Sequence, residues 1–332
     1  MEGLPVIDVA ALVAPGTDPE DRRAVGRELD AACRRHGFFI AAGHGVDPTL
    51  QDRMDAAARA FFARPEAEKA GVAMTRGGRA WRGWFPVRGE LTSGVADHKE
   101  GLYLGIELPD DDPRVRAGLP LHGPNLWPAQ PSDLRPAVEA WTEAMTRLGH
   151  VLMGGLALGL GLDRDWFARH LTGDPVTLFR IFHYPPVPPP AEGWGVAEHT
   201  DYGLLTVLAQ DHHGGLQVRA PEGGWIDVPA EPGALICNIG DMLDRLTGGR
   251  YRSTPHRVRP SVGPGGRLSF PFFFDPGWDA EVEPLPLVGE VPPDDAAHRW
   301  DGTSLQHLHG TYGDYLTAKV AKVFPDLAKD VI

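Results

Sequence analysis

The N-terminal part of the chain combines short apolar runs with amphipathic patterns of helical spacing. Residues 5–8, in LPVIDVAAL, form an apolar stretch that predicts a short strand before a turn. Asp18 followed by Pro19 is a helix start, since aspartate caps a first turn and proline suits the first helical position. Apolar residues then recur at helical spacing up to Gly37, which ends this helix. The run FFIAAGHGV predicts a buried strand that closes on a glycine turn, and residues 48–62 predict a second amphipathic helix.

A third amphipathic pattern opens at Pro136 and predicts the longest helix of the chain. Its apolar face consists of Val138, Trp141, Met145, Leu148 and Leu152. The apolar run HVLMGGLALGLGL, from His150, is too short to span a membrane and is rich in glycine, so we expect a buried helix end there. A further short helix is expected over residues 163–170.

Between residues 177 and 274 the apolar runs are short, and turn residues recur every eight to twelve positions. The predicted strands lie in TLFRIFHYP, GLLTVLAQ, LQVRA, GWIDV, ALICNIG, HRVRP and RLSFPFFF. This spacing favours a closed or double-sheet β architecture over βαβ units. A linker rich in Pro, Asp and Glu then leads to a predicted C-terminal helix in GTYGDYLTAKVAKVF. We therefore predict one domain, mainly β, with flanking helices.

Composition and charge narrow the classes of function. The 332 residues are 42% apolar, which is enough for a substantial core. A formal charge of −13 opposes phosphate backbones and anionic lipid surfaces, so we expect neither nucleic acid nor a membrane as partner. Cys33 and Cys237 lie far apart and indicate no disulfide framework, and the N-terminus lacks the basic region of a secretory signal. Both observations favour a cytoplasmic location.

The candidate chemistry centres on a histidine and an aspartate two positions apart. On an extended strand, or at its end, His199 and Asp201 point to the same side, so that one ion can bind both. His256, at the start of the predicted strand HRVRP, can supply a third ligand. Two imidazoles and one carboxylate are the facial ligand set that holds non-haem Fe(II) and leaves coordination positions open. A closed structural site would use four protein ligands.

Other histidines compete with this interpretation, because a lone His-x-Asp is common and usually structural. His98 and Glu100 have the same spacing, but they lie in the N-terminal half without later partners in register, so we interpret them as structural or substrate-facing. His212 and His213 follow Asp211 at a glycine-rich turn, where solvation is expected rather than ligation.

Arg267 and Ser269 alternate in the same way and so share a face of their predicted strand. A guanidinium beside a hydroxyl is a good receptor for a carboxylate, because the fork binds two oxygens and the hydroxyl adds a third donor. The apolar run after Ser269 makes a partner anion necessary, since burying an unpaired charge is costly.

Taken in order, these motifs resemble the Fe(II)/2-oxoglutarate-dependent dioxygenase superfamily, in its isopenicillin N synthase-like branch. LPVIDVAAL, CRRHGFFIAAGHGV and FFARPEAEK are similar to the N-terminal region of that family. HTDYGLLTVLAQD, GLQV, NIGDMLDRLTGGRYRSTPHRV and RLSFPFFFDP are similar to its catalytic region. The resemblance covers nearly the whole chain.

The resemblance implies a double-stranded β-helix core, the cupin-like jelly roll. One oxygenase domain would span residues 1–332, with the helical and mixed N-terminal region of the family over 1–130. The catalytic core would occupy 175–280, and a C-terminal helix 303–325.

The resemblance also implies roles for individual residues. The implied iron ligands are His199, Asp201 and His256. Arg267 and Ser269 correspond to the residues that hold the distal carboxylate of 2-oxoglutarate, and Tyr184 matches a tyrosine that often donates to it. The family frequently has Asn before this Tyr-Pro, whereas this chain has Phe182 and His183 there, which changes the hydrogen bonding available to the co-substrate. No catalytic residue beyond the iron ligands is implied.

The implied reaction is hydroxylation or desaturation of a small-molecule metabolite with Fe(II), 2-oxoglutarate and O₂, releasing succinate and CO₂. An alternative is an oxidase of the isopenicillin N synthase type, which uses Fe(II) and O₂ without 2-oxoglutarate; the Arg-x-Ser pair would then hold the substrate's own carboxylate. A non-catalytic binding protein is a third possibility, against which the intact triad argues. We expect a small-molecule partner and a monomer or weak homo-oligomer.

Indications for the substrate are weaker. The candidate pocket residues are Tyr103, Trp84, Phe272 and Phe274. Possible partners for a substrate anion are Arg82, Arg88 and Lys99.

Overall fold

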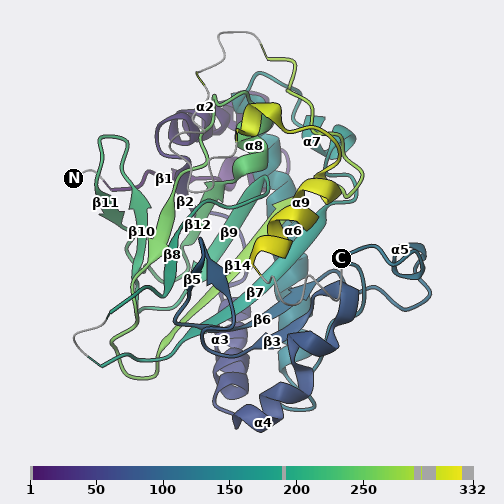
Figure 1. Cartoon of the computed structure of the whole chain (residues 1–332). Helices are drawn as coiled ribbons and strands as arrows, with labels where there is room; N and C mark the ends of the chain where they lie inside the picture. The colour runs from purple at the N-terminus through teal and green to yellow at the C-terminus, as the bar shows by residue number, and fades with distance from the viewer. Residues whose placement is uncertain (1–2, 189–191, 288–292, 294–303, 324–332) are drawn as a thin grey trace.

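The computed structural model describes residues 3–188, 192–287, 293 and 304–323, and its centre is a large β-sheet (Figure 1). Eight strands form this sheet in the order β1-β2-β12-β9-β14-β7-β6-β3. They are β1 (Val6–Asp8), β2 (Phe38–Ala42), β12 (Leu235–Ile239), β9 (Leu205–Gln210), β14 (Arg267–Asp275), β7 (Val176–Tyr184), β6 (Glu100–Gly105) and β3 (Gly83–Phe85). The β1–β2 pair is parallel, and the other pairs are antiparallel.

A smaller sheet of four strands, in the order β11-β10-β13-β8, packs on one face of the large sheet. Its strands are β11 (Trp225–Asp227), β10 (Leu216–Arg219), β13 (His256–Val258) and β8 (Val196–His199). A separate apolar core joins the two sheets; it includes Phe38, Ile40 and Ile236 of the large sheet and Leu216, Val218 and Val258 of the small one. These two facing sheets confirm the predicted mainly β fold with a jelly-roll core. A hairpin of β4 (Leu91–Thr92) and β5 (Val95–Ala96) lies beside β8.

Helices cover the other face of the large sheet. The long helix α6 (Leu134–Gly159) contacts β9 and β14, and α2 (Pro19–Arg35) and α3 (Pro48–Phe62) pack against α6 (Figure 1). All five predicted apolar positions of α6 are buried. Each such side chain contributes roughly 1.5–3 kcal/mol when it leaves water, so the apolar stripe explains why α6 docks on the sheet.

The predicted boundaries of the N-terminal and long helices agree with the structure to within a few residues. The Asp18 carboxylate accepts a hydrogen bond from the Glu20 N–H at 2.8 Å, which caps α2 as expected. Gly37 follows this helix at φ +64°, a conformation that favours glycine. In contrast, α6 begins at Leu134 rather than Pro136, because proline tolerates the first turn as well as the first position.

The remaining helices are short, except for α9 (Tyr312–Val323) near the C-terminus. They are α1 (Ala10–Val13), α4 (Glu66–Lys69), α5 (Pro113–Arg116), α7 (Trp166–His170) and α8 (Asp241–Leu246). The predicted short helix over 163–170 is thus confined to its second half. The C-terminal helix predicted over 303–325 begins only at Tyr312, and residues 303, 324 and 325 lie outside the described residues.

Helix α9 crosses in front of the large sheet (Figure 1). None of the helices in the described part of the chain combines the length and the apolarity that a membrane span requires.

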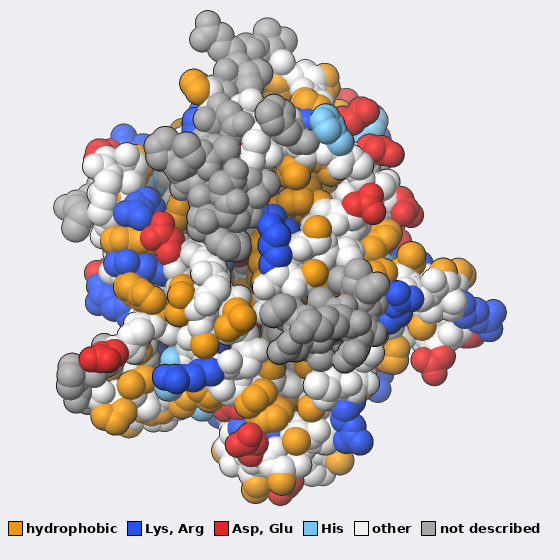
Figure 2. Space-filling view, viewed as in Figure 1, with side chains coloured by type: hydrophobic (Ala, Val, Ile, Leu, Met, Phe, Trp, Pro, Cys, Tyr) orange, Lys and Arg blue, Asp and Glu red, His pale blue; other side chains and the backbone are white. Residues whose placement is uncertain are grey.

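Charge on the visible surface is mixed. On the face shown in Figure 2, acidic and basic side chains are interspersed rather than gathered into one basic stripe.

Candidate metal and co-substrate site

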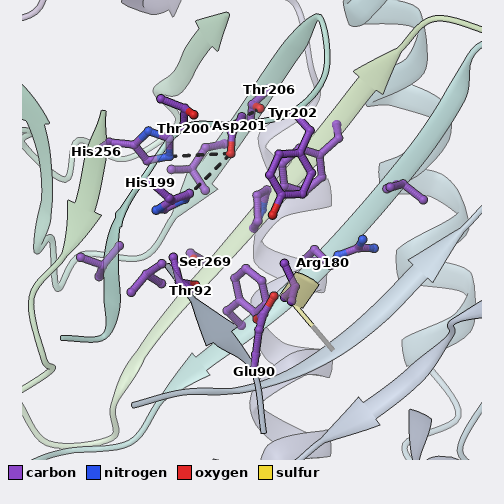
Figure 3. A pocket seen from close by; sticks show the side chains of 18 of the residues that line it. Glu90, Thr92, Arg180, His199, Thr200, Asp201, Tyr202, Thr206, His256 and Ser269 are labelled. Carbon is purple, nitrogen blue, oxygen red and sulfur yellow. Dashed lines mark hydrogen bonds and ion pairs between the residues drawn. The ribbon is translucent and has the colours of Figure 1, made fainter. Parts of the chain in front are cut away.

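A cavity lies between the two sheets and reaches the hairpin β4–β5 and helix α9 (Figure 3). The small sheet supplies His199 at the end of β8 and His256 at the start of β13, and these two residues face each other in the strand register. Asp201 lies just after β8, with its side chain on the same side as that of His199. The antiparallel β8–β13 pairing therefore brings together residues that are far apart in the sequence.

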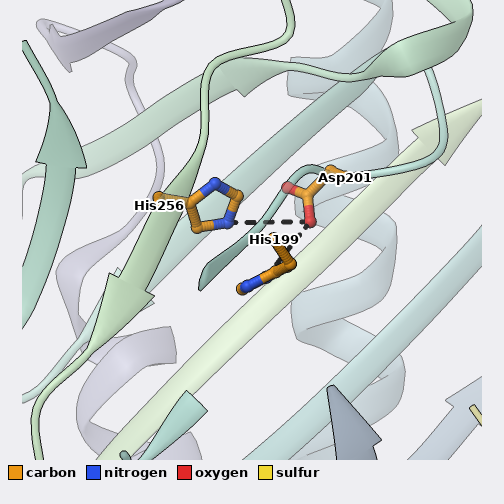
Figure 4. Close-up of side chains that lie close together, drawn as sticks. All are labelled: His199, Asp201 and His256. Carbon is orange, nitrogen blue, oxygen red and sulfur yellow. Dashed lines mark ion pairs between the residues drawn. The ribbon is translucent and has the colours of Figure 1, made fainter. Parts of the chain in front are cut away.

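The three side chains point at one another (Figure 4). Asp201 Oδ1 lies 3.9 Å from His199 Nε2 and 3.8 Å from His256 Nε2. One ligand atom from each residue lies within 4.8 Å of the other two, which is compact enough for a shared metal ion. The triad predicted from the sequence is thus assembled in the fold.

Neighbouring groups orient the two histidines. His199 Nδ1 lies 2.8 Å from the Ala197 carbonyl, and His256 Nδ1 lies 3.2 Å from the Thr254 carbonyl. Those carbonyls accept the Nδ1 protons, so each Nε2 lone pair is directed to the centre of the triad.

The carboxylate of Asp201 is oriented by two donors from the large sheet. Its Oδ2 accepts hydrogen bonds from the Thr206 hydroxyl at 2.6 Å and the Asn238 amide at 2.7 Å. Because these donors occupy Oδ2, the other oxygen, Oδ1, faces the histidines.

Electrostatics keep the triad in the protonation states that metal binding needs. Burial lowers the pKa of His256 to about 4, and it also lowers the pKa of His199 despite the nearby Asp201 carboxylate. Burial by itself would raise the pKa of Asp201, but His256, His199 and the two hydrogen bonds to Oδ2 lower it overall. Two neutral imidazoles and one carboxylate therefore face the same point, as a divalent ion requires.

Arg267 lies on the large sheet, on the opposite wall of the same cavity. Its side chain is 2% exposed; Nη2 donates to Gln210 Oε1 at 3.0 Å, while Nε and Nη1 are buried without a hydrogen-bond partner among the described residues. Tyr184 is directly opposite in the strand register, and its ring lies 4.6 Å from the guanidinium carbon. Ser269 Oγ lies 3.5 Å from the Tyr184 hydroxyl. Two unpaired buried donors beside two hydroxyls fit the carboxylate of 2-oxoglutarate.

The structure places the candidate substrate-pocket residues in different surroundings. Tyr103 lines the cavity. Phe272 and Phe274 do not, because successive residues of β14 alternate between faces and these two point into the core against α6; Phe273 lines the cavity instead. Trp84 is also outside the cavity, where its indole N–H donates to Glu100 Oε2 at 2.8 Å.

The three cations suggested for a substrate anion lie in different surroundings. Lys99 lines the cavity but is paired with the carboxylates of Glu90 and Asp97. Arg82 is buried at a second cavity and donates to the Leu121 carbonyl at 2.8 Å, and Arg88 is exposed.

The sequence analysis missed three cations that line the cavity: Lys319 and Lys322 on α9, and Arg180, which is on the same face of β7 as Tyr184. Strand alternation in TLFRIFHYP could have identified Arg180, because residues four apart on a strand point to the same side.

Comparison with known proteins identifies the family. Residues 4–130 match the N-terminal family described as non-haem dioxygenase in morphine synthesis, and residues 175–276 match the 2OG-Fe(II) oxygenase superfamily. A Dictyostelium discoideum protein named as a probable iron/ascorbate oxidoreductase is 42% identical, over 100% of this chain and 98% of its own length. A homoarginine-6-hydroxylase of Arabidopsis thaliana is 33% identical, over 97% of this chain and 98% of its own length.

Solved structures agree with this assignment. The crystal structure of a full-length Neurospora crassa protein in complex with alpha-KG, which is 2-oxoglutarate, has a TM-score of 0.79 and 25% identity, over 96% of both chains. A 2OG-Fe(II) oxygenase family protein from Caulobacter crescentus also has a TM-score of 0.79, with 28% identity over 97% of this chain and 99% of the other. The chain therefore belongs to the 2OG-Fe(II) oxygenase superfamily, and it is an oxidoreductase that uses Fe(II), 2-oxoglutarate and O₂.

Proposed function

We propose that His199, Asp201 and His256 hold the iron of this oxygenase and that Arg267, Ser269 and Tyr184 hold the distal carboxylate of 2-oxoglutarate. One observation carries the proposal: the assembled triad faces the same cavity as an arginine with two buried, unpartnered nitrogens. The overall reaction converts 2-oxoglutarate, O₂ and a substrate C–H into succinate, CO₂ and a C–OH.

Bound at the triad, Fe(II) supplies the redox chemistry with O₂. The chain's own residues perform the positioning. The two imidazoles and the carboxylate would hold the ion and would leave coordination positions open for the co-substrate. Arg267 fixes the far end of 2-oxoglutarate, so that its 2-oxo acid end is oriented toward the triad. Apolar walls such as Leu208 and Val258 keep water from the reacting groups.

The proposal also covers the size of the substrate, the cellular location and the oligomeric state of the enzyme. The substrate is a small molecule, in keeping with a cavity enclosed between two sheets. A cytoplasmic location is supported by Cys33 and Cys237, which are both buried as free thiols. We also propose a monomer or weak homo-oligomer, which light scattering after size-exclusion chromatography would test.

The proposal is tested by measuring succinate and O₂ uptake with Fe(II), with and without 2-oxoglutarate. We expect the His199→Ala and Asp201→Ala variants to lose both iron retention and succinate formation, while a surface variant such as His212→Ala keeps them. Full turnover in either triad variant would overturn the ligand assignment. O₂ uptake that does not depend on 2-oxoglutarate would overturn the assignment of Arg267, Ser269 and Tyr184 as co-substrate residues.

A further inference from the structure

Another buried cation, Arg180, faces the same cavity as Arg267 from a different position, and the proposed function gives it no role. It lies in the middle of β7 and is 6% exposed. In the view of Figure 3 it lies across the pocket from His256. Burying a guanidinium is costly unless an anion or hydrogen-bond acceptors compensate it.

The contacts of Arg180 satisfy only one of its three nitrogens. Nη1 donates long hydrogen bonds to the carbonyls of Leu104 at 3.3 Å and Phe179 at 3.4 Å. The guanidinium carbon lies 3.4 Å from the ring centroid of Tyr103, its direct partner on β6. Nε and Nη2 donate to no described residue, and they form the edge of the guanidinium that can bind both oxygens of one carboxylate.

The nearby carboxylates are already engaged by other groups. Glu90 accepts a hydrogen bond from the Tyr103 hydroxyl and lies 2.8 Å from the Lys99 ammonium. Asp275 accepts from the Leu204 N–H at 3.1 Å and from the Tyr312 hydroxyl at 2.5 Å. Within the described part of the chain, no carboxylate oxygen lies within 4 Å of Arg180. The free edge of Arg180 is therefore available to a ligand.

Arg180 and Arg267 project into the cavity from well-separated points of the large sheet. Arg267 is directly opposite Tyr184 in the strand register, and Tyr184 is four residues from Arg180 along β7. At roughly 3.3 Å per residue, the backbone positions are about 13 Å apart along the sheet. The two guanidiniums also lie over different rings, that of Arg180 over Tyr103 and that of Arg267 over Tyr184. A co-substrate carboxylate held by Arg267 thus leaves Arg180 free for a second molecule.

We propose that Arg180, stacked on Tyr103, binds a carboxylate of the primary substrate, which is therefore a small organic acid. This inference rests on the proposed function. Tyr103 fixes the plane of the guanidinium, and the free edge then binds the acid in a bidentate manner. With that end held, the rest of the molecule extends through the cavity toward the triad. Arg180 is thus a specificity-determining residue, and the bond that reacts is remote from it.

The test compares a panel of small organic acids with their primary amides as stimulators of 2-oxoglutarate-dependent succinate formation by the Fe(II)-loaded enzyme. We expect acids to stimulate turnover and amides not to do so. In Arg180→Gln, kcat/KM for the best acid should fall about 10²–10³-fold, while the KM for 2-oxoglutarate and the substrate-free succinate rate stay within about 3-fold. Arg180→Lys should recover part of the loss, because it keeps the charge but not the fork.

Arg259→Gln is the matched control, since it removes a positive charge that lies outside the cavity and forms a surface ion pair with Asp227 at 2.6 Å. We expect it to change the acid kcat/KM by less than about 3-fold, because exposed charges are screened. Three results would overturn the inference. Amides could stimulate turnover as strongly as acids do, or no acid in the panel could stimulate it. The ratio of acid to amide stimulation could also be the same in Arg180→Gln as in the wild type. If the wild-type enzyme formed no 2-oxoglutarate-dependent succinate in any of these reactions, the proposed function itself would be wrong. That outcome can be distinguished from failure of the Arg180 inference alone.

Discussion

The replacement Arg267→Ala tests the co-substrate site most directly. In the structure, two of the three guanidinium nitrogens are buried without a partner among the described residues, and the third donates to Gln210. A hydrogen bond to a charged group contributes about 1.5–3 kcal/mol, so two of them contribute roughly 3–6 kcal/mol to 2-oxoglutarate binding. At about 1.4 kcal/mol for each factor of ten, the KM for 2-oxoglutarate should rise about 10²–10⁴-fold.

The assay is succinate formation at saturating Fe(II) over a range of 2-oxoglutarate concentrations. Arg267→Lys should lie between the wild type and Arg267→Ala, because lysine keeps the charge but cannot bind two oxygens in the same plane. Arg259→Ala is the control, since Arg259 forms a surface ion pair with Asp227 at 2.6 Å and its loss should leave the KM unchanged. A folded Arg267→Ala enzyme with a KM within about 3-fold of the wild type would refute the reasoning.

Three other replacements probe the contacts around the site. Asn238→Ala should weaken Fe(II) binding about 10–100-fold in a metal titration, because it removes a hydrogen bond that orients Asp201; unchanged affinity would contradict this. Phe272→Ala should lower the free energy of unfolding by about 3–5 kcal/mol in urea, because its side chain is fully buried, and a loss below about 1 kcal/mol would refute its placement in the core. Burial raises the pKa of Asp275 from 3.8 in the unfolded chain to about 7 in the folded protein. The stability contributed by this shift is therefore fully present below the unfolded-state pKa, and it is lost as the pH rises through about 7. Between about pH 5 and 8 the wild type should therefore lose roughly 3 kcal/mol of unfolding free energy relative to Asp275→Asn, and parallel pH profiles of the two proteins would speak against this.

Local sequence patterns were sufficient to predict much of the fold. The cap at Asp18, the glycine at position 37 and the apolar stripe of α6 each depend on neighbours within a few residues. Such short-range chemistry can be read along the chain. The aromatic positions of β14 show where this reading fails: Phe272, Phe273 and Phe274 are equally apolar, and only the packing of α6 against one face decides that Phe273 borders the cavity.

The candidate site likewise has features that could be predicted from the sequence and features that could not. The amino-acid sequence by itself determined the donor types, their spacing and their order, because residues two apart on a strand share a face wherever that strand lies. Only the tertiary structure decided that β8 and β13 pair so that His199 meets His256, and that Arg180 has a free edge whereas Lys99 is held by two carboxylates. The physical reason is that ligation and ion pairing act over a few ångströms, and the distances between remote segments are set by the pairing of strands and the packing of the core.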